Sequence, residues 1–138
     1  MSKQSSSAAS VESLKKIPLF SKLSTRSLQR LAKVATHYEA PAGSVLIQPN
    51  VPGTGLIIIE EGETVVELPR KKLERSAGEC FGELSLLTGK GHIARVRAKT
   101  DVRCLAISRE HFSEMLEAEP KMAISMLQIL ADRLSDQG

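Results

Sequence analysis

The stretch Cys80–Lys99, CFGELSLLTGKGHIARVRAK, holds the features from which the fold and a candidate site can be predicted. In it Phe81-Gly82-Glu83 places a glycine directly before a carboxylate, and the apolar half-turn Leu84–Leu87 follows. A short helical turn after a glycine directs several unpaired backbone N–H groups at one point, which suits a phosphate. A carboxylate at the same turn would not favour that anion, so a pair of hydroxyls, such as a ribose edge, is its better partner. The stretch therefore predicts a site for a small sugar phosphate.

Short strands separated by turn residues lie on both sides of this candidate site. They are expected at His37–Ala40, Ser44–Gln48, Leu56–Glu60, Thr64–Leu68, Lys71–Arg75, Ile93–Ala98 and Val102–Ile107. About eight short strands at roughly ten-residue spacing predict a double-sheet jelly roll. The fold class is therefore mostly β with flanking helices.

Helical patterns flank the strands at both ends of the chain. The first is Val11–Lys16, which Pro18 stops, and the second is Thr25–Thr36, for which Ser24 is a plausible N-cap. At the other end we expect a helix over Arg109–Ala118 and a last helix from Pro120 to about Ser135. The Ser-rich residues 1–10 predict a disordered tail, and residues 11–138 a single domain.

Composition excludes several classes of protein. The chain has 138 residues, a formal charge of +3 and 3% aromatic residues, which argues against a nucleic-acid-binding surface. No apolar run approaches the ~18 residues that a membrane span needs. Cys80 and Cys104 form no metal-binding or redox motif, so we expect two buried free thiols and a cytoplasmic location. The sequence shows no acid–base pair, nucleophile or metal cluster, so we do not expect an enzyme.

The candidate stretch resembles the phosphate-binding cassette of cyclic nucleotide-binding domains. This family includes bacterial cAMP-sensing transcription factors, regulatory subunits of protein kinases and gated ion channels. The resemblance rests on Phe81–Leu87 and Val96–Thr100, with support from Pro18–Phe20 and Leu105–Ser108, so it spans nearly the whole chain. It implies a β-roll with N-terminal helices and two C-terminal helices around a cyclic mononucleotide, cAMP or cGMP, with no further cofactor.

The resemblance also assigns roles to residues of the cassette. Phe81 begins the motif, and Gly82 lets the backbone approach the ligand closely. Glu83 would accept a hydrogen bond from the ribose 2′-hydroxyl, and the N–H groups of Leu84 and Ser85 would hold the cyclic phosphate.

Two residues depart from the family pattern. His92 stands where the family usually has an arginine that pairs with the phosphate, and Ile93 stands where a small or hydroxyl-bearing residue is preferred. A histidine offers one hydrogen bond where an arginine offers two, and it is mostly neutral at pH 7. Lys90 in the glycine-rich loop could supply the missing charge or be a solvated loop lysine, whereas strand alternation places Arg95 on the opposite face from His92.

Two functions remain open at this point. The first is a regulatory module that binds a cyclic nucleotide, moves its C-terminal helices and signals to a partner or a fused effector. The alternative is a degenerate domain that no longer binds nucleotide and serves protein contacts. The last helix carries an apolar stripe at 3–4 spacing, so a protein partner or a second copy of the chain is expected to contact it.

Overall fold

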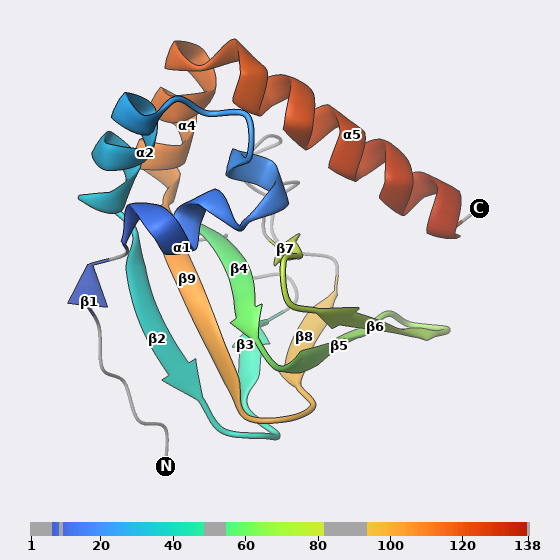
Figure 1. The fold of residues 1–138 in the computed structure, drawn as a ribbon. Helices are drawn as coiled ribbons and strands as arrows, with labels where there is room; N and C mark the ends of the chain where they lie inside the picture. The colour runs from blue at the N-terminus through green and yellow to red at the C-terminus, as the bar shows by residue number, and fades with distance from the viewer. Residues whose placement is uncertain (1–6, 9, 49–54, 82–93, 138) are drawn as a thin grey trace.

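Two antiparallel sheets form the centre of the computed structural model, which describes residues 7–8, 10–48, 55–81 and 94–137 (Figure 1). Sheet A has the strand order β1-β2-β9-β4-β7, and sheet B has the order β3-β8-β5-β6. The strands of sheet A are β1 (Ser7–Ala8), β2 (Thr36–Ala40), β9 (Val102–Ser108), β4 (Gly55–Glu61) and β7 (Cys80–Phe81). Those of sheet B are β3 (Val45–Ile47), β8 (Arg95–Ala98), β5 (Glu63–Glu67) and β6 (Lys72–Ser76).

Helices from both ends of the chain cover the outer face of sheet A. They are α1 (Val11–Lys15), the 3₁₀ helix η1 (Pro18–Phe20), α2 (Thr25–Ala32), α4 (Arg109–Ala118) and α5 (Pro120–Gln137). Their buried side chains form one apolar cluster with outward-facing residues of β4 and β9. The strands contribute Leu56, Ile58, Leu105 and Ile107, and the helices contribute Leu14, Phe20, Leu28, Leu31, Phe112 and Met122. The cluster explains why short N-terminal helices are stable, because each buries its apolar face against the same strands.

The inward-facing residues of both sheets form two further clusters. One contains Ala40, Val102 and Cys104 of sheet A with Ala98 of sheet B. The other contains Ile59 and Phe81 of sheet A with Ile47 and Val96 of sheet B. Sheets A and B therefore pack face to face, as the jelly roll predicted from the sequence requires.

The structure confirms the double-sheet fold with flanking helices and changes three details. The helix expected over Thr25–Thr36 ends at Ala32, because the Val34 N–H donates to Leu31 O in a tightened turn and Thr36 pairs with Ala106 in β9. Val34 and Ala35 still pack against the core, which is why the sequence shows them in the apolar stripe.

The other two details concern short strands that sequence periodicity does not show. Ser7–Ala8, inside the stretch expected to be a tail, pair as β1 with Thr36 and His37. Cys80–Phe81 pair as β7 with Ile57 and Ile58. A pair of residues is too short to carry an alternation pattern, so such strands are defined only by their partner strand. Among the helices of the described ranges, none is long and apolar enough to cross a membrane.

The chain passes from sheet A to sheet B at Gly62, between β4 and β5. Gly62 has φ +95°, and a Cβ atom there would lie 2.4 Å from the carbonyl oxygen of Asp101. The adjacent Glu63 N–H donates to Thr100 Oγ1 at 3.0 Å, and the Lys99 N–H donates to Glu63 O at 2.9 Å. Glycine is therefore required both by the backbone conformation and by the close approach of the β8–β9 turn.

We expect Gly62→Ala to lower the free energy of unfolding by about 2–4 kcal/mol, because it adds a backbone clash to the strain of a left-handed residue. Gly43→Ala is the matched control: Gly43 also has positive φ (+90°), but a Cβ there meets nothing within 4 Å. Strain alone should cost that variant about 1–2 kcal/mol. Urea unfolding followed by circular dichroism measures both, and equal losses would contradict the role given to the clash.

Candidate functional site

The structure describes the frame of the predicted site and one of its residues. Phe81 lies in β7 and is buried. Gly82, Glu83, Leu84, Ser85, Lys90, His92 and Ile93 lie outside the described residues, so the roles predicted for them stay predictions. What the structure does show is how the chain enters residues 82–93 and how it leaves them.

A tight turn directs the chain into the candidate stretch. Gly78 adopts φ +94°, its N–H donates to Ile59 O at 2.8 Å, and the Ile59 N–H donates to Glu79 O at 2.9 Å. The Glu79 carboxylate accepts a hydrogen bond from the Ser76 N–H at 2.7 Å, which holds the turn from within. These bonds fix Phe81 opposite Ile57 on the inner face of sheet A.

After residues 82–93 the chain continues as strand β8 of sheet B. Strand β8 pairs with β5 in the register Arg95↔Glu67 and Val96↔Val66. Val96 is 3% exposed and lies in the same inner cluster as Phe81. Residues 82–93 therefore connect an anchored strand of sheet A to an anchored strand of sheet B.

An apolar platform lies between these two anchors. Its buried members are Ile47, Ile59, Phe81 and Val96, and Leu46, Ile57 and Val66 pack against them. Its members are apolar and pack against one another, so they supply no group that could neutralise an anion. Any charge needed by a phosphate must come from elsewhere.

The arginines nearest to the exit point do not face the platform. Arg95 lies 3.8 Å and Arg97 3.3 Å from the carboxylate of Glu67, and the side chains of both arginines are about two-fifths exposed. Arg97 also donates to Gly43 O at 3.0 Å. Both arginines therefore belong to the outer face of sheet B, as strand alternation predicts for Arg95, while Val96 between them points inward.

A buried polar pair on the other side of sheet A was not found from the sequence. His37 in β2 contacts Glu60 in β4 through Nδ1, and the side chains are 8% and 13% exposed. Arg103 in β9 lies 3.8 Å from the same carboxylate. A cleft of about 620 Å³ next to it is lined by Lys16, His37, Glu60 and Arg103, among other residues. The pairing depends on the register of three strands, so His37 shows no partner in its sequence neighbourhood.

Both thiols are buried, as predicted. Burial raises the pKa of the Cys104 thiol to about 11. Cys104 is therefore protonated at neutral pH and is a poor nucleophile or metal ligand. Within the described ranges, no group of three His, Cys, Asp or Glu side chains is placed to hold a metal ion.

Comparison with known proteins agrees with this frame. The family profile described as "Cyclic nucleotide-binding domain" matches residues 38–119, which include the whole candidate stretch and both of its anchors. A cAMP-dependent protein kinase regulatory subunit from Aspergillus fumigatus is 36% identical over 108 residues, which are 75% of this chain and 26% of that protein. This chain thus spans about a quarter of the length of that relative.

Two solved structures show the same fold at higher coverage. A cyclic nucleotide-binding domain from Methylobacillus flagellatus has 28% identity and a TM-score of 0.75, and covers 91% of this chain and 76% of its own. A mutant regulatory subunit of a cAMP-independent protein kinase A from Trypanosoma brucei has 30% identity and a TM-score of 0.76. The match covers 86% of this chain and 44% of that chain. That mutant is bound to cAMP in its A site, and its substitutions include a threonine changed to arginine and the next residue, a valine, changed to alanine.

The profile matches more than half of the chain, and it covers all of sheet B, the strands β9, β4 and β7 of sheet A, and residues 82–93 between the sheets. The protein belongs to the cyclic nucleotide-binding domain family.

Proposed function

We propose that this chain is a regulatory module that binds a cyclic mononucleotide, cAMP or cGMP, and signals through its C-terminal helices. The observation that carries the proposal is the family match over residues 38–119, which includes Gly82-Glu83 and the strands on both sides of them. The nucleotide would act as a regulatory ligand rather than as a cofactor, and we propose no catalytic activity.

The frame supports this proposal by what it offers to each part of such a ligand. The platform around Phe81 and Val96 provides apolar contact between the two sheets. The N–H groups of Leu84 and Ser85 would bind the cyclic phosphate, and Glu83 would accept the ribose 2′-hydroxyl. Phosphate and ribose would thus be bound by one short segment that two sheets hold in place.

The signal would leave through α4 and α5. Both helices contribute to the cluster on sheet A through Phe112, Met115 and Met122. Farther along α5, Ile124 is 51% and Leu127 65% exposed. We propose that nucleotide binding changes how α5 packs and that this exposed face contacts a protein partner or a second copy of the chain. Cys104 is a buried thiol outside any disulfide, which is typical of a reducing compartment and supports a cytoplasmic location.

A second candidate function is a domain that keeps the fold for protein contacts without binding nucleotide. His92 and Ile93 favour it, because the loss of a phosphate-binding arginine costs about 2–5 kcal/mol. That is roughly thirty-fold to a few thousand-fold in affinity. The Trypanosoma brucei protein, described as cAMP-independent, was solved with cAMP after an arginine and an alanine had been introduced side by side.

The first prediction separates these functions by titration of the chain with cAMP and cGMP at pH 6.0 and pH 7.5, followed by calorimetry. A histidine with a pKa of ~6.5 is about three-quarters charged at pH 6.0 and about one-tenth charged at pH 7.5. If the charged form of His92 binds the phosphate, affinity is lost as the pH rises through that pKa. We expect binding up to about eight-fold tighter at pH 6.0.

The control for the pH effect is His92→Gln, which keeps a hydrogen-bonding side chain but cannot be protonated. Its affinity should not change between the two pH values. Absence of binding by the unmodified chain at millimolar nucleotide and both pH values would exclude the first function and leave the second.

The second prediction concerns restoration of the arginine. We expect His92→Arg with Ile93→Ala to bind cAMP at least about thirty-fold more tightly than the unmodified chain, since the arginine fork adds two charge-assisted hydrogen bonds. Ser113→Arg is the matched control, because it adds an arginine on the exposed side of α4. An unchanged or weaker affinity of the double variant would show that His92 is not at the phosphate.

The third prediction tests the route of the signal by hydrogen–deuterium exchange of the double variant with and without saturating cAMP. Amide exchange in α5 should slow, because the backbone hydrogen bonds of a helix open less often once the helix packs over a ligand. Strands β2 and β9 are the internal reference, since they pair over their full overlap and should not change. Saturation without any change in α4 or α5 would contradict helix movement.

A further inference from the structure

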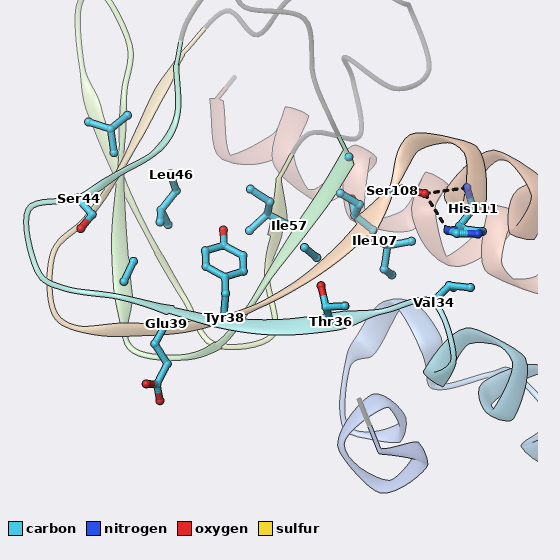
Figure 2. Close-up of a pocket in the computed structure, with 15 residues that line it drawn as sticks. Val34, Thr36, Tyr38, Glu39, Ser44, Leu46, Ile57, Ile107, Ser108 and His111 are labelled. Atoms are coloured by element: carbon cyan, nitrogen blue, oxygen red, sulfur yellow. Dashed lines mark hydrogen bonds between the residues drawn. The ribbon is translucent and has the colours of Figure 1, made fainter. Parts of the chain in front are cut away.

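A second cavity lies between the sheets, at the end of the roll where α4 begins. It has a volume of about 680 Å³ and is lined by residues of β2, β3, β4, β9 and the first turn of α4 (Figure 2). None of the buried platform residues Ile47, Phe81 and Val96 lines it. Among the described residues, the cavity and the platform of the proposed nucleotide site have Leu46 and Ile57 in common.

The cavity exists because the inner face of sheet A carries small side chains at this end. Thr36 of β2 is paired with Ala106 of β9, and Gly55 of β4 is paired with Ser108. Successive residues of a strand point to opposite faces, so the neighbouring Leu105 and Ile107 face the helices, where large side chains fill the core. Along this part of β9, the outer face of sheet A is densely packed against the helices, and the inner face borders the cavity.

The polar side chains among the described residues of the lining are Thr36, Tyr38, Glu39, Ser44, Ser108 and His111. Figure 2 shows the Tyr38 hydroxyl directed into the space and the Glu39 carboxylate directed away from it. Burial raises the pKa of Tyr38 above its ordinary value, so the hydroxyl stays neutral at any cellular pH. It also forms a side-chain hydrogen bond with Cys104, and a hydroxyl group can make a further hydrogen bond to a ligand. At the other end, Ser108 Oγ lies 2.8 Å from His111 Nδ1 (Figure 2).

The charge of the lining restricts the class of ligand. No lysine or arginine is among the described residues that line the cavity, and its one carboxylate points outward. The described lining offers an anion one imidazole, that of His111, which already contacts Ser108, so an ionic ligand would lose hydration here with little compensation. Apolar side chains such as Leu46 and Ile57 form much of the wall, and the volume lies in the range of pockets for small organic molecules.

We propose that this cavity is a second ligand site, for a small uncharged molecule that is mostly apolar and carries one hydrogen-bonding group toward Tyr38. Its occupant is bound by apolar contact with β3 and β4 and oriented by the tyrosine hydroxyl. Among the described residues, Ile47, Ile59, Phe81 and Val96 of the platform do not line this cavity, so we propose it as a site separate from that of the nucleotide.

The test uses 2-naphthol, which is uncharged at pH 7, and its carboxylate analogue 2-naphthoate, with methyl-labelled protein followed by NMR. We expect saturable binding of 2-naphthol, with nuclear Overhauser contacts to the methyl groups of Leu46 and Ile57. Binding of 2-naphthoate should be at least ten-fold weaker. Equal or tighter binding of the carboxylate would overturn the assigned class, and absence of saturable 2-naphthol binding would overturn the site.

Variants locate the ligand and do not depend on a single substitution. Ala106→Leu and Thr36→Ile fill the cavity from two different strands, and each should weaken 2-naphthol binding at least ten-fold. Ala118→Leu, on the exposed side of α4, is the control and should bind as the unmodified chain does. Circular dichroism establishes that each variant is folded. If both folded filling variants bind 2-naphthol like the control, the ligand is not in this cavity and the proposal fails.

The tyrosine hydroxyl is tested separately. Tyr38→Phe keeps the ring and removes the donor, so we expect 2-naphthol affinity to fall about two- to ten-fold, the effect of one neutral hydrogen bond. Naphthalene, which lacks the hydroxyl, should bind both proteins equally. An equal loss for naphthalene would show that Tyr38 acts through packing and would overturn its role in orientation.

Discussion

The packing of Phe81 and Val96 in one apolar cluster is the constraint on which the candidate site depends. Phe81 is fixed to sheet A by its pairing with Ile57, and Val96 is fixed to sheet B by its pairing with Val66. Because the two sheets pack face to face through these side chains, the points where the chain enters and leaves residues 82–93 are held at a set distance. A segment tied at both ends in this way can present its backbone N–H groups to a ligand at a low cost in conformational entropy.

The same packing limits what the frame can contribute to binding. Its inner surface is apolar, and the adjacent cations Arg95 and Arg97 both lie beside Glu67 on the outer face of sheet B. The charge balance of a bound phosphate therefore depends on the segment itself, where His92 and Lys90 are the cationic candidates. An arginine carries a permanent charge, whereas the charge of a histidine depends on pH. The fold and the affinity for a nucleotide are thus separable properties.

The residues that could be predicted from the sequence are those whose local pattern is decisive. The strand expected over Val102–Ile107 and the helix expected over Arg109–Ala118 are found as β9 and α4, because each depends on neighbours in the chain. Ser108, for example, caps α4 by accepting a hydrogen bond from the His111 N–H. Pairing between distant strands could not be predicted. The end of α2 at Ala32 is set by Thr36 bonding to Ala106, and the partner of His37 is set by the position of Glu60 two strands away. The candidate site was found through a motif of consecutive residues. Its frame was found only in the structure, because it depends on contacts between strands that are distant in the sequence.

The inner cavity is the clearest case of a feature that only the assembled sheets reveal. Thr36, Gly55 and Ala106 are unremarkable in sequence, and they create space only because three strands bring them to one face. Leu46 and Ile57 line the cavity and also pack against the platform, so one wall serves both regions. A shared wall does not by itself couple two sites, since coupling requires that an occupant on one side favours one arrangement of the wall over another. The close packing of Ile59, Phe81 and Val96 against these residues restricts such arrangements to discrete side-chain rotamers. Any communication between cavity and platform would therefore pass through the rotamers of Leu46 and Ile57 rather than through movement of the sheets.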